Sequence, residues 1–214
     1  VWPGPVVRTR LEVPDVEAWS DERPARYRAV VRLWCGGPEA DPTDGDNLGE
    51  PVEVAAVLTG FRSVEVAGRE LRINGAAPLI RGVNRHEHDP QRGRFVDPEA
   101  TWTELCLAKR LNVNAIRTSH APWFYDMCNE LGLYVVDETN VETHARQESL
   151  LAGPGYTGAV IERGLRMVGR DRNHPCVIVW SLGNEAGEGA APHGLAGAIG
   201  HLDPSRPLGY EGPI

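Results

Sequence analysis

The sequence predicts an α/β protein in which a parallel sheet or an incomplete (β/α)8 barrel follows part of a small all-β sandwich. Three observations lead to this prediction. The first 66 residues contain short segments in which apolar and polar side chains alternate. From residue 79 onward, strand-like and helix-like segments alternate along the chain. The segment at 177–182 (VIVWSL) is too apolar for either of its faces to meet water, which is typical of a buried parallel strand.

The N-terminal region, residues 1–66, is expected to form part of the sandwich. Residues 26–34 (RYRAVVRLW) alternate and are rich in side chains that favour strands, and residues 52–57 show a similar pattern. Residues 36–50 lie between them and are dense in Gly, Pro and Asp, which indicates an exposed loop. Short antiparallel strands are therefore expected here.

A hairpin is predicted at the start of the second domain, residues 67–214. Asn74 and Gly75 form an Asn-Gly pair, which is the strongest short signal for a two-residue turn. The segments on either side of this turn, residues 71–73 and 78–80, are short and apolar. We expect these two segments to pair as strands.

The rest of the second domain is expected to consist of repeated strand–helix units. Asp97 suits an N-cap and Pro98 the first helical position, while Pro122 opens a second helix that Gly132 is suited to end. About four units in roughly 140 residues are near half of the ~250 residues that a complete barrel needs. The strands are expected at 79–83, 114–117, 133–136, 177–182 and 208–210, and the helices at 97–111, 122–132 and 161–170, with one more after the strand at 177–182.

Charge and composition exclude several classes of protein. The 214 residues carry a formal net charge of −8, which repels nucleic-acid phosphates and anionic lipid. No apolar run approaches the ~20 residues that cross a bilayer. The four cysteines lie far apart in sequence and form no CxxC pair, which argues against a zinc ribbon or a redox motif. We therefore expect no nucleic-acid or membrane partner, and free thiols favour a reducing, cytoplasmic location.

Polar and ionisable residues gather just after the first four predicted strands of the second domain. In a parallel barrel the carboxyl ends of the strands share one face, and catalytic groups sit on that face. Four consecutive strands that end in such groups therefore predict an active site. The candidates are His86 after the first strand, Arg117 and His120 after or at the end of the second, Glu142 and His144 after the third, and Asn184 and Glu185 after the fourth.

Each candidate also has a purely structural interpretation. Glu185 suits a solvated turn at the end of a strand, and the spacing alone does not separate the two roles. Glu142 and His144 are two residues apart, which suits a metal in an extended chain but is more often only surface. Lone histidines such as His86 and His120 more often hydrogen-bond a loop, and Arg117 inside a strand suits a structural ion pair.

Five stretches make the sequence similar to a known family. They resemble the catalytic barrel of the β-galactosidases of glycoside hydrolase family 2, and the resemblance covers essentially the whole chain. Residues 1–66 resemble the immunoglobulin-like domain that precedes this barrel, with Gly60-Phe61-Arg62 marking its end. The matching stretches of the barrel are 80–88 (IRGVNRHEH), 114–120 (NAIRTSH), 132–144 (GLYVVDETNVETH), 170–185 (RDRNHPCVIVWSLGNE) and 203–207 (DPSRP).

The resemblance implies a role for each candidate in a retaining β-galactosidase that removes terminal non-reducing β-D-galactose from lactose-type substrates. Glu185 would protonate the glycosidic oxygen and later activate water. His86 and His120 would contact galactose and stabilise the transition state. Asn184 would hydrogen-bond the sugar. Arg117 would also belong to the substrate-binding residues and would support the acidic cluster.

A cofactor is also implied by the resemblance. Glu142, His144 and Glu185 would bind the Mg²⁺ of the active site, an ion that prefers oxygen ligands and keeps several waters. A Na⁺ site is implied as well, with most of its ligands outside this chain. A carboxylate on a metal has its charge partly compensated, so the cation would influence when Glu185 holds its proton.

The nucleophilic Glu of the family would lie on a later barrel strand, beyond Ile214. Glu211 follows the possible fifth strand, but Tyr210-Glu211-Gly212 resembles a different family segment, so Glu211 is not expected to be the nucleophile. The chain is therefore expected to be an inactive fragment of a homo-oligomeric enzyme.

Two other functions compete with this interpretation. His86-Glu87-His88 is an HxH at the end of a predicted strand, as in metal-dependent hydrolases of the amidohydrolase kind. Tightly bound zinc would favour that class, and weakly bound Mg²⁺ the glycosidase. A non-catalytic sugar-binding remnant is the other alternative, and glycan binding without turnover by the complete protein would support it.

Overall fold

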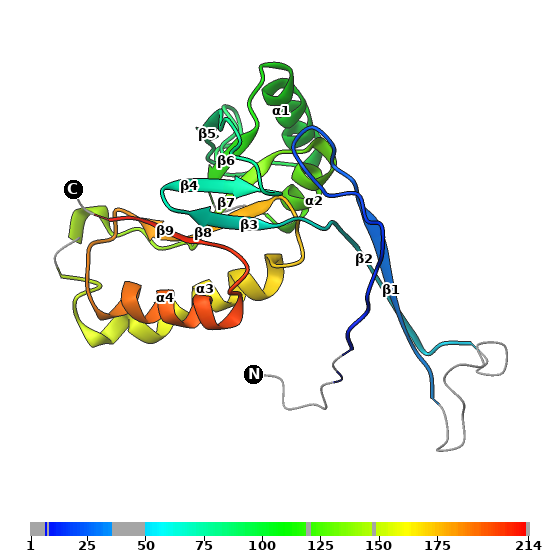
Figure 1. Ribbon diagram of the computed structural model, residues 1–214. Helices are drawn as coiled ribbons and strands as arrows, with labels where there is room; N and C mark the ends of the chain where they lie inside the picture. Colours follow the sequence, from blue (N-terminus) through cyan, green and yellow to red (C-terminus); the bar gives the residue numbers. More distant parts are fainter. Residues whose placement is uncertain (1–6, 8, 36–49, 119–120, 147–148, 213–214) are drawn as a thin grey trace.

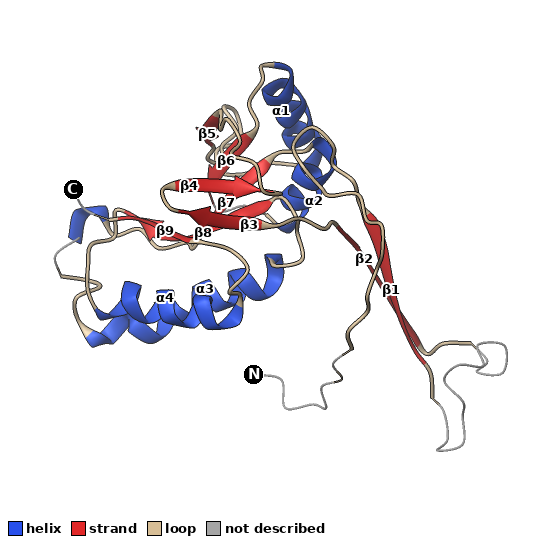
Figure 2. Cartoon of the chain, in the orientation of Figure 1, coloured by secondary structure: helices blue, strands red, loops and turns tan. Residues whose placement is uncertain are grey.

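The computed structural model describes residue 7 and residues 9–35, 50–118, 121–146 and 149–212. Its centre is a five-stranded parallel sheet in the order β5-β6-β7-β8-β9, so every crossover leads to the neighbouring strand (Figure 1). Helices α1 to α4 connect these strands and lie along the sheet (Figure 2). The predicted α/β fold is confirmed.

The strands are β1 (Tyr27–Leu33), β2 (Glu53–Thr59), β3 (Val64–Ala67), β4 (Glu70–Ile73), β5 (Gly82–Asn84), β6 (Ala115–Thr118), β7 (Tyr134–Glu138), β8 (Val177–Asn184) and β9 (Leu208–Glu211). The α-helices are α1 (Pro98–Arg110), α2 (Pro122–Leu131), α3 (Thr157–Asp171) and α4 (Ala190–Leu202). Two short 3-10 helices span His144–Arg146 and Pro154–Tyr156.

The helix ends follow the local signals of the sequence. The side chain of Asp97 accepts a hydrogen bond of 2.8 Å from the backbone N–H of Ala100, and Pro98 is the first residue of α1. Helix α2 ends before Gly132, which adopts the left-handed conformation with φ 67°. A Cβ atom at Gly132 would come within 2.3 Å of the carbonyl oxygen of Asp21, so close packing also requires glycine here.

The predicted hairpin is right in its turn and in its first strand, residues 71–73, which lie in β4, and wrong in its second strand. The backbones of Ile73 and Ala76 exchange two hydrogen bonds around Asn74 and Gly75, which forms the two-residue turn. No strand follows at 78–80, however. Instead β4 pairs backward with β3, from Val64 opposite Ile73 to Ala67 opposite Glu70. The partner of β4 therefore precedes it in the chain.

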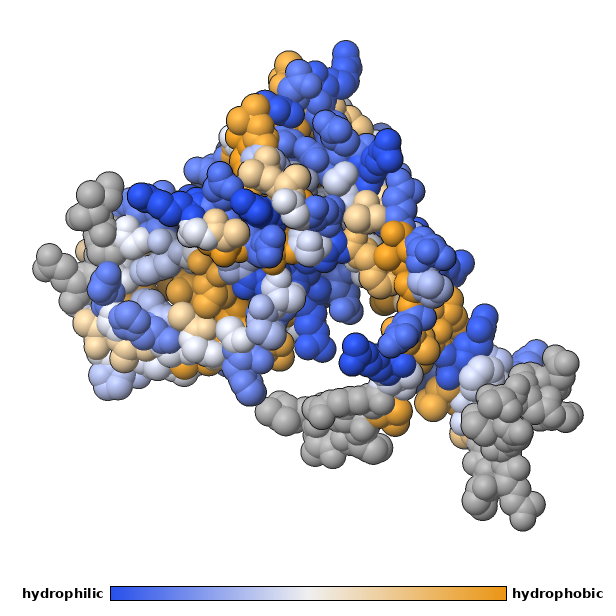
Figure 3. Space-filling model, in the orientation of Figure 1, coloured by the Kyte–Doolittle hydropathy of each residue, from blue (hydrophilic) through white to orange (hydrophobic). Residues whose placement is uncertain are grey.

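Strands β1 and β2 form a long antiparallel ribbon that runs away from the sheet (Figure 1). Apolar side chains gather along this ribbon (Figure 3), and Val31 remains 69% exposed and Val54 53%. Within the part of the chain that the structure describes, no third strand joins the ribbon. The sandwich expected for residues 1–66 therefore stays a prediction, and the predicted loop at 36–50 lies almost wholly outside the described residues.

A segment before the ribbon packs against the α/β sheet. Trp19 is fully buried, its indole N–H donates to the carbonyl of Asn129 at 2.9 Å, and its ring meets Tyr134 edge-on at 5.8 Å. The ammonium of Lys109 donates to the carbonyls of Asp21 and Gly132, each at 2.6 Å. These contacts attach the residues around Trp19 to the end of the sheet where the strands begin.

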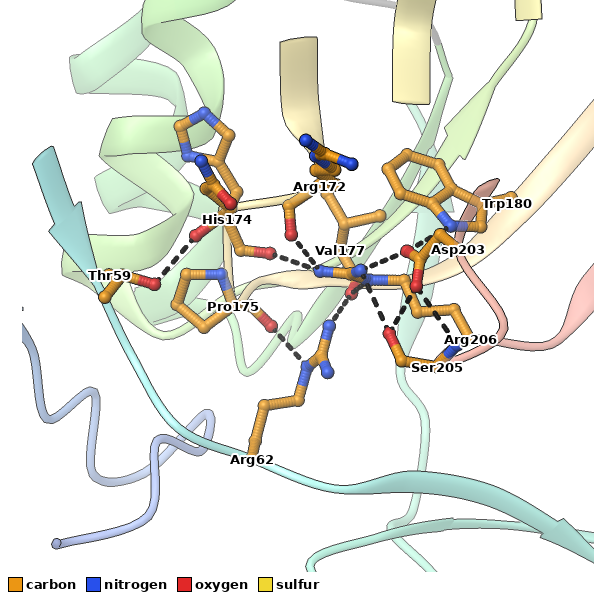
Figure 4. Close-up of polar contacts among 11 residues, drawn as sticks. Thr59, Arg62, Arg172, His174, Pro175, Val177, Trp180, Asp203, Ser205 and Arg206 are labelled. Atoms are coloured by element: carbon orange, nitrogen blue, oxygen red, sulfur yellow. Dashed lines mark hydrogen bonds and ion pairs between the residues drawn. The ribbon is translucent and has the colours of Figure 1, made fainter. Parts of the chain in front are cut away.

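Two arginines organise the turn between α3 and β8 (Figure 4). Both Arg62 and Arg206 donate to the carbonyl oxygen of Val177, at 2.5 and 2.8 Å. Arg206 also pairs with Asp203, whose carboxylate accepts a hydrogen bond of 2.9 Å from the indole of Trp180. Because buried carbonyls that lack a partner are costly, these guanidinium groups stabilise the turn. Further carbonyls bound by the two arginines belong to Arg172, His174 and Pro175.

A pair of buried carboxyl groups lies between the sheet and its helices. The hydroxyl of Tyr125 donates to Oδ1 of Asp137 at 2.7 Å, while Oδ2 of Asp137 meets no donor among the described residues. Asp171 lies beside it and is held by Arg170 through two bonds of 2.7 Å. Burial, and then the charge of Asp171, raise the pKa of Asp137 well above its usual value. A proton on Asp137 satisfies the geometry, because it supplies the missing donor between the two carboxyl groups.

This arrangement predicts a pH-dependent stability. A carboxyl group with a raised pKa in the folded state binds its proton more tightly there than in the unfolded chain. Its contribution is complete below the unfolded pKa of about 4 and is lost as the pH rises through the raised value. Asp137→Asn, which cannot ionise, should therefore lose less stability with rising pH than the natural protein.

The measurement is the thermal unfolding midpoint of both proteins at pH 5, 7 and 9. We expect the midpoint of Asp137→Asn minus that of the natural protein to increase with pH. Glu65→Gln, at an exposed position of β3, is the matched control and should leave this pH dependence unchanged. Parallel curves for Asp137→Asn and the natural protein would show that Asp137 does not bind the proton.

Candidate active site

The carboxyl ends of the five parallel strands meet at a polar cavity of about 260 Å³. Strands β5 to β9 each bring a residue to it, either from the strand itself or from the loop that follows. Five of the seven residues predicted for the site line this cavity. The lining consists of Asn84, His86, Arg117, Glu138, Glu142, Asn184, Glu185 and Glu211.

Arg117 is the centre of this group. Its Nε donates to Oε2 of Glu138 at 2.9 Å, and its terminal nitrogens contact Glu138 at 2.7 Å, Glu211 at 2.5 Å and Oδ1 of Asn184 at 2.7 Å. The guanidinium thus joins strands β6, β7, β8 and β9 through side chains on one face of the sheet. The structural ion pair considered for Arg117 is present, and it lies inside the predicted site.

Asn184 connects this centre to the loop after β7. Its amide Nδ2 donates to Oε1 of Glu142 at 3.2 Å, and its backbone N–H donates to the carbonyl of Val141 at 3.0 Å. Glu142 and Asn184 also form an isolated parallel bridge. With Oδ1 bound to Arg117 and Nδ2 bound to Glu142, the orientation of the Asn184 side chain is defined by its contacts.

Glu185 is held in an unusual backbone conformation. Its φ is 41°, in the left-handed region that residues other than glycine rarely adopt. The backbone N–H of Glu185 donates to the carbonyl of Glu211 at 2.9 Å. The carboxylate is 39% exposed, and its Oε2 lies 2.9 Å from Nε2 of His144. Such strain is found mainly where the surrounding structure maintains it, often at functional sites.

His144 lies between two carboxylates. Its Nδ1 is 3.5 Å from Oε1 of Glu142, and its Nε2 is 2.9 Å from Oε2 of Glu185. The three predicted metal ligands are therefore brought together, and their oxygen-rich donor set suits Mg²⁺. As arranged here, the ring of His144 separates the carboxylates. Across the described residues, no group of three His, Cys, Asp or Glu side chains is placed to hold a metal ion.

The last two predicted residues, His86 and His120, differ in outcome. His86 is exposed and lines both this cavity and a neighbouring one of about 590 Å³, which Glu87, His88 and Arg94 also line. His120 lies outside the described residues. The HxH of His86 and His88 spans the wall of the neighbouring cavity, and the carboxylate of Glu87 accepts a hydrogen bond from the backbone of Ala121 at 3.1 Å.

Two residues of the site had no assigned role in the sequence interpretation. Glu138 is not among the candidates from the sequence, and Glu211 was considered only as a nucleophile. In the register of the sheet, Arg117 lies opposite Val136, which is two residues before Glu138 and on the same face of β7. Asn184 lies opposite Glu211. Opposite charges near the ends of neighbouring parallel strands were the signal that could have identified them.

A larger cavity of about 830 Å³ lies elsewhere, between β2 and the helices, and Trp102 and Trp123 contribute to its walls. It contains none of the predicted site residues.

No helix in the described part of the chain has the length and apolar character needed to cross a membrane.

Comparisons with known proteins agree with this geometry. The family model for the TIM barrel domain of glycosyl hydrolases family 2 matches residues 64–214. Over 210 residues the chain is 46% identical to a β-galactosidase of Erwinia tasmaniensis, covering 96% of this chain and 19% of that protein. Over 207 residues it is 47% identical to a β-galactosidase of Yersinia enterocolitica, covering 94% of this chain and 19% of that protein.

Solved structures show the same similarity. The crystal structure of a family 2 β-galacturonidase from Eisenbergiella tayi, bound to galacturonate, superposes with a TM-score of 0.76 at 26% identity, covering 96% of this chain and 36% of that one. A β-glucuronidase from Ruminococcus gnavus superposes with a TM-score of 0.77 at 25% identity, covering 92% and 33%. The chain spans about a fifth of the length of the curated relatives it matches.

The strained end of β8 generates a prediction. Gly183 has φ 143°, and a Cβ atom there would lie 2.7 Å from the carbonyl of Val141, which accepts the N–H of Asn184. Gly183→Ala should therefore lower the free energy of unfolding by about 1–3 kcal/mol. Urea unfolding followed by tryptophan fluorescence measures this loss. Gly197→Ala, in α4 with open space around it, is the control and should be neutral or stabilising; an equal effect of both changes would contradict the close approach at Gly183.

Proposed function

Because the chain belongs to family 2 of the glycosyl hydrolases, we propose that the protein to which it belongs is a retaining β-galactosidase whose acid/base residue is Glu185. The observation that carries this proposal is the placement of Glu185. It stands at the end of β8, at the mouth of the polar cavity, with its backbone held in a strained conformation. The substrate would be a terminal non-reducing β-D-galactoside of the lactose type.

The chemistry proposed for Glu185 requires two successive proton transfers through the same carboxyl group. As a carboxylic acid it would protonate the glycosidic oxygen as the bond to the leaving group breaks. As a carboxylate it would then remove a proton from the water that releases the sugar. Its partial exposure suits this role, since both the leaving group and the water must reach Oε1 or Oε2.

The partner of Glu185 would be a carboxylate nucleophile about 5–5.5 Å away, as retaining enzymes require. We place it on a part of the protein outside this chain. Glu211 is a poor candidate because its carboxylate already pairs with Arg117 and its carbonyl already binds the backbone of Glu185. Without a nucleophile, the 214-residue chain alone should not hydrolyse galactosides.

The neighbouring residues would bind and polarise the sugar. Asn184 presents an amide that is oriented by Arg117 and Glu142, and we propose that it hydrogen-bonds a sugar hydroxyl. His86, on the cavity wall, and His120 would contact galactose and stabilise the positive charge that develops on the ring. Arg117 would compensate the charges of the acidic cluster.

We propose Glu142, His144 and Glu185 as the residues that hold Mg²⁺. Support comes from their proximity, from the oxygen-rich donor set and from the exposure of all three side chains. When bound, the ion would supply positive charge beside the carboxyl group of Glu185. A Na⁺ site with most ligands outside this chain belongs to the same proposal.

Galactosides are favoured over uronides by the comparisons. The relatives at 46–47% identity are β-galactosidases, whereas the glucuronidase and galacturonidase structures share only 25–26% of their residues with this chain. We further propose that residues 1–66 form part of an immunoglobulin-like sandwich, because the exposed apolar face of the β1–β2 ribbon suits a second sheet. The complete protein would be a homo-oligomer.

The test of this proposal uses the complete protein and two galactosides. Glu185→Gln should lower kcat/KM for lactose by about 10²–10⁴-fold, since proton donation to a poor leaving group is lost. The loss should be smaller for 4-nitrophenyl β-galactoside, whose leaving group needs little protonation. Glu188→Gln, at an exposed position three residues later, is the matched control and should retain activity. Undiminished turnover of lactose by Glu185→Gln would refute the assignment, and inactivity of the natural protein on both substrates would refute the function.

Removal of the metal gives an independent prediction. Calorimetric titration of the chelator-treated protein should show Mg²⁺ binding that Glu142→Gln weakens by about tenfold or more. The exposed Glu162→Gln serves as the control. Equal Mg²⁺ affinity of the natural protein and Glu142→Gln would exclude Glu142 as a ligand.

A further inference from the structure

We propose that Glu211 is a positioning residue of the active site: it holds Arg117 in place and, through Arg117, orients Asn184 beside Glu185. The inference rests on the proposed function for its kinetic part and on geometry alone for its structural part.

The side-chain contacts fix Arg117 from three directions. Glu138 occupies Nε and one terminal nitrogen, Asn184 accepts from the same terminal nitrogen, and Glu211 alone occupies the other, NH1, at 2.5 Å. The planar guanidinium has a fixed fork of donors, so its orientation is set by the carboxylates at its edges. Without Glu211, the NH1 edge keeps no carboxylate partner among the described residues, and the plane is free to turn about its contacts with Glu138.

Two carboxylates bind Arg117, and Glu138 is the more restrained of them. Glu211 is therefore the one whose side chain has more freedom to move. The hydroxyl of Ser181 donates to Oε2 of Glu138 at 3.1 Å, the same oxygen that Arg117 binds. Glu138 also lies on β7, whose two neighbours in the sheet are both present. Glu211 lies instead at the end of β9, the edge strand of the described sheet.

Glu211 is attached to the acid/base residue through its backbone as well. The carbonyl of Glu211 accepts the N–H of Glu185 at 2.9 Å, and Glu211 stands opposite Asn184 in the register of β8 and β9. The backbone of Glu211 therefore defines the position of Glu185, while its side chain defines the orientation of the Asn184 amide through Arg117. A single residue thus fixes both members of the Asn-Glu pair relative to each other.

Exposure separates this role from a role in folding. The side chain of Glu211 is 59% exposed, and ion pairs at such positions contribute little to stability. A substitution that removes its charge should therefore leave the fold intact. A displacement of about 1 Å at a catalytic group can nevertheless lower a rate about 10²-fold. We expect a large kinetic effect together with a small effect on unfolding.

The kinetic test is a double-mutant cycle in the complete protein with 4-nitrophenyl β-galactoside. Glu211→Gln should lower kcat about 10- to 100-fold and leave the thermal midpoint within about 2 °C of that of the natural protein. In the background of Asn184→Ala, the same change should lower kcat less than about threefold, because the residue through which it acts is gone. Glu162→Gln, an exposed carboxylate of α3, is the control and should leave kcat unchanged.

Two kinetic outcomes overturn the proposal. If the effects of Glu211→Gln and Asn184→Ala simply multiply, Glu211 does not act through Asn184. If Glu211→Gln keeps the kcat of the natural protein, Arg117 needs no carboxylate at this edge. Inactivity of the natural protein, by contrast, refutes the proposed function and leaves the positioning role to a structural measurement.

That measurement is the crystal structure of Glu211→Gln. The distance between the Arg117 guanidinium and Oδ1 of Asn184, 2.7 Å here, should exceed hydrogen-bonding range, with the Asn184 amide rotated. An unchanged contact between Arg117 and Asn184 in the variant would overturn the proposal whether or not the protein is a glycosidase.

Discussion

The carbonyl oxygen of Val177 is the point on which the position of the candidate active site depends. Arg62 and Arg206 both donate to it, and Arg206 is braced by Asp203 (Figure 4). Val177 is the first residue of β8, the strand that ends at Asn184. A strand is a stiff element, so the bonds that fix its first residue also determine where its last residue emerges. The site is thus placed from the opposite end of the sheet, by the buried guanidinium of Arg206 and the partly buried guanidinium of Arg62, which contact none of the residues that line the site.

The alternation of a single strand gives two adjacent carboxyl groups opposite environments. Asp137 faces the helices, where burial and the neighbouring Asp171 favour its protonated form. Glu138 points to the opposite face of the sheet, where it pairs with the guanidinium of Arg117. Since successive side chains of a strand point to opposite faces, a one-residue slip of β7 would exchange these environments. The buried carboxyl pair therefore also opposes misregistration of the strand that supports the candidate active site.

Local signals in the sequence predicted the α/β part accurately. They did not predict the contacts between segments that are distant in sequence. The ends of α1 and α2 depend on single residues, Asp97 and Gly132, whose effect is confined to one turn of helix. The hairpin was wrong because a turn at Asn74 does not reveal whether the chain after it continues to pair. Residues at the strand ends were identified because topology alone brings them together. The roles of Glu138 and Glu211 required the curvature and register of the sheet, which no short motif encodes.

The positive φ of Glu185 places selection for folding and selection for chemistry in conflict at one position. Glycine would adopt this conformation without strain, and a chain selected only for ease of folding would drift toward it. Glycine, however, has no carboxyl side chain that could hold or release a proton. The proposed proton transfer would account for a carboxylate at a position whose backbone angle favours glycine. If Glu185 is the acid as proposed, position 185 offers a way to recognise degenerate relatives, in which relief of the strain and loss of the acid would occur together.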